Sequence, residues 1–160
     1  MFLADKYKVI EFKELTRTVV EAASALGCEV AQIAKSIIFK TAENKAILVV
    51  ASGINRIDEA LIESELGEKI FKADADFVRG QTGYVIGGVP PWGHLNKIET
   101  YIDMDLDRFE RIWAAAGKNN AVFELTFEEL VKETGGRVMK IKTPLVLLQA
   151  QDHLPLKKGE

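Results

Sequence analysis

"SIIFKTAENKAILVVA", residues Ser36–Ala51, has two apolar runs on either side of a short polar segment. The runs Ser36–Lys40 and Ala46–Ala51 are rich in Ile, Val and Phe, which are residues that favour strands. The segment between them, "TAENK", has the length and polarity of a hairpin connection. The stretch therefore predicts two antiparallel strands that pair with each other.

Further short β-rich runs follow the predicted hairpin. They are Lys69–Lys72, Tyr84–Ile86, Ile98–Ile102, Ala121–Leu125 and Val138–Ile141. Strands this short, interleaved irregularly with helices, indicate an α+β fold, because a doubly wound sheet would show longer apolar strands alternating with longer helices. We predict a mixed, barrel-like sheet of about six to seven short strands with surrounding helices.

Four helices are predicted from their caps and their apolar spacing. Thr18 with Glu21 and Thr126 with Glu129 are capping boxes, in which the threonine hydroxyl and the glutamate carboxylate each accept from the other residue's backbone N–H. Glycines that follow these helices are natural stops. The predicted helices span about 18–27, about 126–135 and about 58–67, and a fourth carries Leu106, Phe109, Ile112 and Trp113 and ends at Gly117. The acidic residues 103–107 are interpreted as its start and as a solvated face.

Length and charge limit the kind of protein. The chain has 160 residues, 48% hydrophobic and 28% charged, with a net charge of −3. This size fits a single domain over residues 1–160, with a core at about 18–141 and a C-terminal tail at 144–160. The charge argues against a long nucleic-acid interface, which needs many basic residues, but not against a pocket that takes the end of a strand.

The single cysteine, Cys28, forms no internal disulfide and is interpreted as a small buried hydrophobe. The first residues lack a signal-peptide pattern, and no apolar run approaches the roughly 20 residues that a membrane helix needs. We therefore expect a cytoplasmic protein without membrane contact. The "LVLL" segment of the tail is a candidate for a further strand.

The loop "TGYVIGGVPPWGH", Thr82–His94, contains two adjacent glycines and two adjacent prolines. Gly87 and Gly88 permit positive φ and close approach of a ligand, and successive N–H groups in such a turn can bind an oxyanion or a phosphate. Pro90 and Pro91 fix φ and make the loop stiff. A purely structural turn explains the same residues, and spacing alone favours it slightly.

Other candidate residues carry weaker signals. Lys35 precedes an apolar strand and can reach over a pocket, although most lysines in such positions are solvated. Trp92 can stack on a base, but core packing is the commoner fate of a tryptophan. His94 and His153 are the two histidines, and no Cys/His/Asp cluster has metal-ligand spacing, so we expect no metal and no cofactor. No standard nucleophile motif is present.

Taken together, these stretches resemble the YbaK / prolyl-tRNA synthetase editing-domain family, the aminoacyl-tRNA deacylases. The resemblance covers about residues 18–141 and depends on several motifs in a fixed order. The motifs are "RTVVEAASALG" (Arg17–Gly27), "QIAKSIIFK" (Gln32–Lys40), "SGINRID" (Ser52–Asp58), "TGYVIGGVPPWGH" (Thr82–His94), "YIDMDL" (Tyr101–Leu106) and "AGKNNAVFELTFEEL" (Ala116–Leu130).

The resemblance implies hydrolysis of the ester that joins a wrong amino acid to the terminal ribose of a tRNA, by a free-standing protein. It assigns Lys35 and the backbone of Gly87 and Gly88 to positioning the aminoacyl 3′ end. An ester beside a vicinal ribose hydroxyl already has an assisting group, so positioning can suffice without a protein nucleophile. The same loop supplies the candidates for substrate contact, which are Thr82, Gly83, Val89, Pro90, Pro91 and His94.

Two positions depart from the family pattern. Val122 occupies the place where some members carry an aspartate, so no catalytic carboxylate is assigned there and the amino-acid specificity stays open. The loop reads Gly-Gly-Val-Pro-Pro where other members have Gly-Gly-x-Ser-Pro, so a serine contact is absent.

Two other functions remain open from the sequence. One is a non-catalytic module that binds an aminoacyl-tRNA end or a synthetase, and the other is hydrolysis of a small ester or amide unrelated to tRNA. The expected partner is the 3′ acceptor end of an aminoacyl-tRNA, with a synthetase as a second candidate. Both a monomer and a homodimer are compatible with the sequence.

Overall fold

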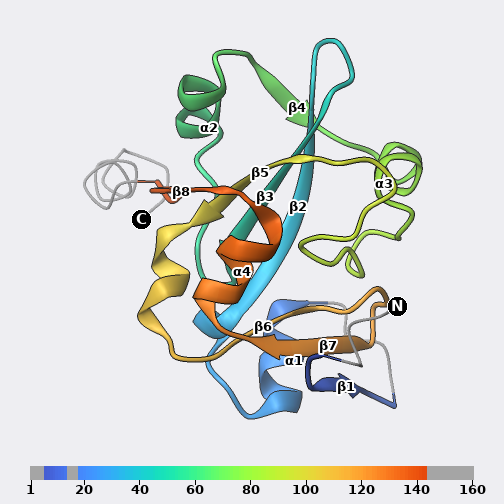
Figure 1. Ribbon diagram of the computed structural model, residues 1–160, viewed down its shortest axis with the longest axis vertical. Helices are drawn as coiled ribbons and strands as arrows, with labels where there is room; N and C mark the ends of the chain where they lie inside the picture. The colour runs from blue at the N-terminus through green and yellow to red at the C-terminus, as the bar shows by residue number, and fades with distance from the viewer. Residues whose placement is uncertain (1–5, 14–17, 144–160) are drawn as a thin grey trace, which may run out of the picture.

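The computed structural model describes residues 6–13 and 18–143, which form one mixed sheet with helices around it (Figure 1). The helices are α1 (Val19–Leu26), α2 (Glu59–Leu66), α3 (Ala75–Thr82) and α4 (Phe127–Thr134), with 3₁₀ turns η2 (Val30–Gln32) and η3 (Met104–Arg108). The strands are β1 (Val9–Glu11), β2 (Ile33–Thr41), β3 (Ala46–Ser52), β4 (Ile70–Lys72), β5 (Glu99–Asp103), β6 (Ile112–Ala115), β7 (Ala121–Leu125) and β8 (Arg137–Met139).

The sheet has the strand order β1-β7-β6-β2-β3-β5-β8, and β4 pairs with β2. The pairs β1–β7, β6–β7, β2–β3 and β2–β4 are antiparallel, whereas β2–β6, β3–β5 and β5–β8 are parallel. The predicted α+β fold with a mixed sheet is confirmed. Within the described residues the sheet has eight strands, and it stays open, with β1 and β8 at its two ends.

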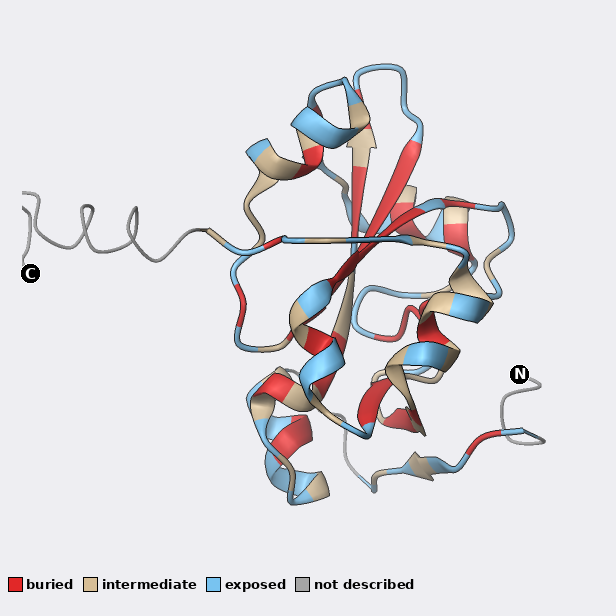
Figure 2. Cartoon of the chain, turned by 60° about the vertical axis from the view of Figure 1, so that its left-hand side comes forward, coloured by how far each residue is buried: buried red, intermediate tan, exposed pale blue. Residues whose placement is uncertain are grey.

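The predicted hairpin is the centre of the sheet. All seven residues of β3 are buried, which Figure 2 shows as a red strand through the middle of the molecule. Leu48 belongs to the apolar cluster that contains Leu130 of α4, and the next residue, Val49, belongs to the cluster that contains Ile62 of α2. Helices thus cover both faces of β3, and each fully buried Leu, Ile or Val stabilises the fold by about 1.5–3 kcal/mol.

Local signals in the sequence predicted three of the four helices correctly. The capping boxes at Thr18 and Thr126 are both present, α2 begins after Asp58, and α1, α2 and α4 each end at a glycine in the left-handed region. These motifs involve only neighbouring residues, so the sequence contains all the information that they need.

Replacing Thr126 by alanine is expected to lower the free energy of unfolding by about 1 kcal/mol, the usual cost of losing a helix N-cap. The Glu129 N–H donates to the Thr126 hydroxyl at 3.1 Å, and that donor would lose its partner. Denaturant unfolding followed by circular dichroism measures the change. The control is Thr126→Ser, which keeps the hydroxyl, and an equal loss in both variants would contradict the capping role.

The predicted helix through Leu106 and Trp113 is wrong. The structure has the turn η3 there and then strand β6, in which Trp113 pairs with Ile33 of β2 and with Glu124 of β7. Pairing with β2, which is distant in the sequence, and with the next strand, β7, overrides the helical spacing of the apolar residues. The acidic start is real, since Asp103 caps η3, but Asp103 is buried rather than solvated.

Other predicted boundaries also change. Residues 84–86 form a turn instead of a strand, because the Gly88 N–H donates to the Val85 carbonyl at 2.9 Å and Gly87 has a φ of 91°. The prediction lacked β1 and α3, although Asp74 caps α3 by accepting from the Phe77 N–H. The expected strand at 138–141 is observed as β8, and the candidate strand in "LVLL" lies outside the described residues.

Trp92 and Cys28 both pack against apolar clusters. The Trp92 ring is buried and lies edge-on to the rings of Tyr7 and Phe123, at centroid distances of 5.7 and 5.4 Å, so core packing is confirmed for this residue. Cys28 is partly buried against the cluster that contains Ala23 of α1. None of the helices in the described part of the chain is long and apolar enough to cross a membrane.

Candidate active site at the open edge of strand β2

Strand β2 has one edge that is only partly covered. On one side it pairs with β3 along its length, but on the other it pairs with β6 at Ile33 and Ala34 and with β4 from Phe39 to Thr41. Residues 35–38 between these pairings have no partner on that edge among the described strands. A cavity of about 240 Å³, which we call the edge cavity, lies beside this open stretch.

The walls of the edge cavity come from segments distant in the sequence. They are the start of α1, the loop at residues 86–89, strands β6 and β7, and the connection between them at Lys118 and Asn119. Most lining side chains are apolar: Val19, Ile33, Val89, Trp113, Ala114 and Val122. Among the described residues that line the cavity there is no Asp, Glu, His or Cys. The cavity therefore suits a small ligand that is partly apolar and is held by a few polar groups.

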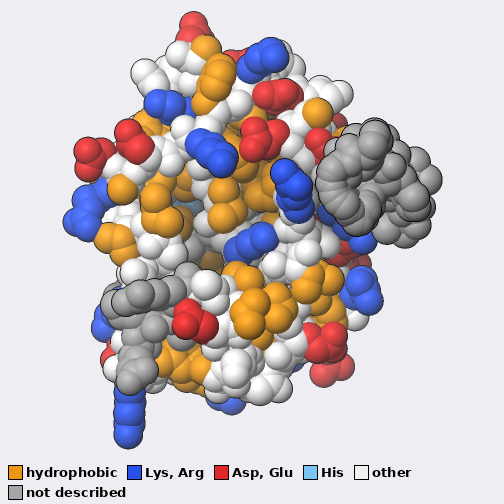
Figure 3. Space-filling view, turned by 180° about the vertical axis from the view of Figure 1, so that it is seen from behind, with side chains coloured by type: hydrophobic (Ala, Val, Ile, Leu, Met, Phe, Trp, Pro, Cys, Tyr) orange, Lys and Arg blue, Asp and Glu red, His pale blue; other side chains and the backbone are white. Residues whose placement is uncertain are grey.

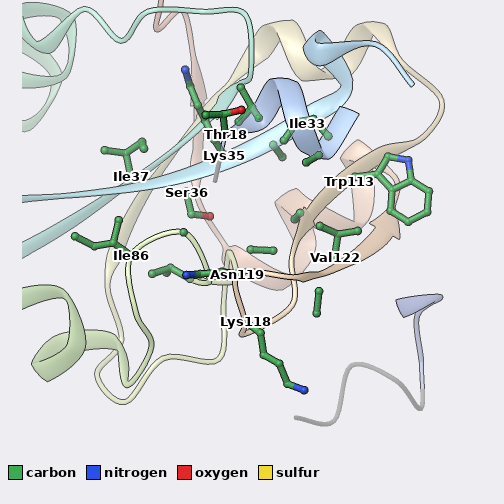
Figure 4. Close-up of a pocket in the computed structure, with 18 residues that line it drawn as sticks. Thr18, Ile33, Lys35, Ser36, Ile37, Ile86, Trp113, Lys118, Asn119 and Val122 are labelled. Carbon is green, nitrogen blue, oxygen red and sulfur yellow. The ribbon is translucent and has the colours of Figure 1, made fainter. Parts of the chain in front are cut away.

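Lys35 lies in the wall of the edge cavity, half-buried, and its Nζ is 3.4 Å from the Gly53 carbonyl oxygen, a long hydrogen bond. In Figure 4 Lys35 extends beside Thr18 on one side of β2, whereas Ser36 extends to the other side, where Asn119 and Ile86 lie. Burial lowers the pKa of the Lys35 ammonium below its usual value, and the nearby Asp103 carboxylate opposes this shift.

A buried polar network supports the carbonyl that Lys35 contacts. One carboxylate oxygen of Asp103 accepts from the Ser52 N–H at 3.0 Å and from the Asn55 amide at 2.8 Å. These bonds fix the turn that contains Gly53. Asp103 therefore helps to position the carbonyl that Lys35 contacts, and its negative charge also raises the Lys35 pKa. This role of Asp103 has no local signal in the sequence, although Asp103 lies in "YIDMDL" and Gly53 in "SGINRID", two of the motifs that carry the family resemblance.

The glycine loop also reaches the edge cavity. Gly87 and Val89 line the cavity, and Gly88 packs so closely on the Lys118 backbone that a Cβ there would lie 3.0 Å from it. The Gly88 N–H is already donated to the Val85 carbonyl. Gly88 is not among the residues that line the cavity, although both of its neighbours are, and its N–H is engaged within the loop.

The remaining predicted contact residues lie elsewhere. Thr82 is buried with its hydroxyl donated to the Val78 carbonyl, and Gly83 is the left-handed C-cap of α3. Pro91 and His94 line a different hollow, in which His94 Nε2 is 2.6 Å from the Pro90 carbonyl oxygen. Burial lowers the pKa of His94. Their roles as substrate contacts stay predictions, and the structure does not bring these residues to the edge cavity.

The edge cavity is lined by basic as well as apolar residues, since Lys35 and Lys118 are among its lining residues. Ile37 and Ile86 line the edge cavity and are exposed. On the face seen in Figure 3, Lys and Arg side chains lie among hydrophobic side chains. This combination suits a ligand with an apolar part and a phosphate.

The fold and the edge cavity define an α+β domain with an open mixed sheet and a small, mostly apolar cavity at a strand edge. The chain belongs to the family of the aminoacyl-tRNA editing domain, whose model matches residues 13–133. This confirms the family that the sequence motifs predicted. The chain is 38% identical over 122 residues to the uncharacterised protein YwhH from Bacillus subtilis (strain 168), covering 76% of this chain and 78% of YwhH.

Solved structures show the same fold. A crystal structure described as that of a proposed trans-editing enzyme for prolyl-tRNA synthetase is 40% identical, with a TM-score of 0.82 over 86% of this chain and 87% of that one. The crystal structure of hypothetical protein APE2540 is 28% identical, with a TM-score of 0.81 over 89% of this chain and 97% of that one.

Proposed function

We propose that this protein is a trans-acting aminoacyl-tRNA deacylase, which hydrolyses the ester of a mischarged tRNA. The family and the similarity to the trans-editing structure support this proposal. The observation that carries it is the edge cavity, whose 240 Å³ is below the roughly 300–1,000 Å³ of sites for drug-sized ligands and so fits an amino acid on its ribose.

Lys35 and the backbone of Gly87 and Gly88 position the aminoacyl 3′ end in this proposal. The Lys35 ammonium holds the terminal phosphate or ribose, while the glycine loop forms a rigid wall against the acyl group. Water adds to the ester carbonyl, and the ribose oxygen leaves with a proton, so the products are a free amino acid and an uncharged tRNA. The vicinal ribose hydroxyl assists, which agrees with a cavity lining without carboxylate or imidazole among the described residues.

A second candidate function is a non-catalytic module that binds an aminoacyl-tRNA end or a synthetase. Val122 favours it, because this apolar residue lines the edge cavity where some family members carry an aspartate. Measurable binding of an aminoacyl-tRNA without hydrolysis of any mischarged tRNA would support this function over the first.

The test is release of the amino acid from a panel of mischarged tRNAs, starting with tRNA charged with Ala, Cys and Ser. We expect rapid release from at least one of them and inhibition by an uncharged acceptor-stem minihelix. Hydrolysis that the minihelix does not inhibit would instead indicate a small ester or amide substrate. No release from any member of the panel would contradict the deacylase function.

A further inference from the structure

The backbone of Ser36 faces the edge cavity. The Gly53 N–H donates to the Ile33 carbonyl at 2.8 Å, and the Thr41 N–H donates to the Lys45 carbonyl at 2.9 Å. In an antiparallel pair, every second residue of a strand directs both its N–H and its C=O toward the paired strand. The residues between them direct both groups toward the opposite edge. The odd-numbered residues of β2 therefore face β3, and the even-numbered Ser36 turns its N–H and C=O to the open edge.

The Ser36 side chain adds a third polar group. Its hydroxyl oxygen is buried and has no hydrogen-bond partner in the described part of the chain. Ser36 lines the edge cavity, and Figure 4 shows its side chain on the opposite side of β2 from Lys35. Buried polar groups are normally hydrogen-bonded, so a donor and acceptor left without a partner beside a cavity points to a ligand.

We propose that Ser36 binds the α-amino acid unit of the acyl group, as one residue of an added strand. The Ser36 N–H donates to the ester carbonyl oxygen, the Ser36 C=O accepts from the α-ammonium group, and the hydroxyl supplies a further contact. In an aminoacyl ester the ammonium donor and the carbonyl acceptor are both attached to the α-carbon. A strand residue presents its N–H and C=O to a facing strand in the same arrangement. This inference rests on the proposed deacylase function.

The arrangement gives Ser36 a part in both catalysis and specificity. Negative charge develops on the carbonyl oxygen when water adds, and an N–H held in place by the strand stabilises that charge without reorganisation. The Gly88 N–H already donates to the Val85 carbonyl. The open edge of β2 therefore provides a hydrogen-bond donor to the ester carbonyl oxygen that Gly88 does not provide. The Ser36 carbonyl in turn selects esters with a free α-ammonium group.

The backbone pairing is tested by changing the substrate. The wild-type protein is assayed on the best aminoacyl-tRNA of the panel and on the α-hydroxyacyl-tRNA obtained from it by deamination. Each rate is divided by the rate of spontaneous hydrolysis, because the ammonium group itself activates an ester. We expect the rate enhancement to fall at least about tenfold for the hydroxyacyl ester, the effect of losing a hydrogen bond to a charged group. Equal enhancements would overturn the proposal.

The hydroxyl is tested by Ser36→Ala, with Ser64→Ala on the exposed face of α2 as the matched control. We expect kcat/KM to fall about tenfold in Ser36→Ala while thermal stability stays equal or rises, since a buried hydroxyl without a partner is removed. Unchanged kcat/KM would overturn the hydroxyl contact, and a fall accompanied by lost stability would indicate a structural role instead. If the wild-type protein hydrolyses neither ester, the proposed function fails and this inference fails with it.

Discussion

Lys35→Ala is expected to lower kcat/KM for the best aminoacyl-tRNA substrate about 100-fold, with the fold intact. A hydrogen bond to a charged group contributes roughly 1.5–3 kcal/mol, and a factor of ten in rate corresponds to about 1.4 kcal/mol. The upper part of the range applies because Lys35 is half-buried, so its charge is poorly screened. Its contact with the Gly53 carbonyl is long, at 3.4 Å, and an incoming phosphate or ribose oxygen can replace it.

The matched control for this variant is Lys40→Ala on the same strand. The Lys40 ammonium lies over the Phe77 ring, and Lys40 does not line the edge cavity. We expect kcat/KM of this control to stay within about twofold of the wild-type value, because exposed charge interactions contribute little free energy. Lys35→Met keeps the aliphatic part and removes the charge, so it should resemble Lys35→Ala. Wild-type rates in Lys35→Ala would show that the ammonium has no role.

Steady-state kinetics also separates two roles for Lys35. If the ammonium binds the tRNA end equally in the ground state and the transition state, the variant raises KM and leaves kcat unchanged. If it stabilises charge that develops only in the transition state, kcat falls instead. The position of Lys35 beside Thr18, on the other side of β2 from Ser36, favours the first result.

The sequence predicted those elements whose signals are local. The hairpin of β2 and β3, the two capping boxes and the glycine stops each depend on residues a few positions apart, and the structure contains all of them. Strand β6 forms by pairing with β2 and β7. The spacing of its apolar residues does not contain this pairing and predicted a helix instead. The short strand β1 likewise exists through its pairing with β7.

The candidate site was only partly predictable for the same reason. Lys35 and Gly87 could be identified from motifs, and both line the edge cavity. Ser36 lies in the same motif as Lys35, but the family resemblance assigns no role to it. Its backbone faces a cavity only because β6 and β4 pair with different parts of β2 and leave residues 35–38 open. Such a gap is a property of the whole sheet, which single-residue patterns do not reveal.

Gly53→Ala is expected to lower the free energy of unfolding by about 3 kcal/mol, at the upper end of the usual cost of overpacking. A Cβ at this position would lie 2.4 Å from the Val30 carbonyl oxygen, which is backbone and cannot rotate away. The end of β3 must therefore move, and the hydrogen bond from the Gly53 N–H to the Ile33 carbonyl would be strained. Denaturant unfolding measures the loss.

The control for this change is Gly80→Ala in α3, for which the opposite sign is expected. A Cβ at Gly80 meets no atom within 4 Å, and its φ is not in the left-handed region. Alanine is favoured over glycine inside a helix by about 1 kcal/mol, so Gly80→Ala should stabilise the protein by up to that amount. If Gly53→Ala lowers the free energy of unfolding only slightly, η2 and the end of β3 can move apart at little energetic cost.

Gly53→Ala should also reduce activity by more than its effect on the folded fraction explains. The same residue supplies the carbonyl that contacts Lys35, and its N–H holds the turn to the start of β2 through the bond to the Ile33 carbonyl. A shift of this turn moves the ammonium away from the edge cavity, and small misplacements of positioning groups cost large factors in rate. Rates measured well below the unfolding midpoint, and corrected for the folded fraction, separate the two effects. Full activity per folded molecule would show that Lys35 keeps its position without Gly53.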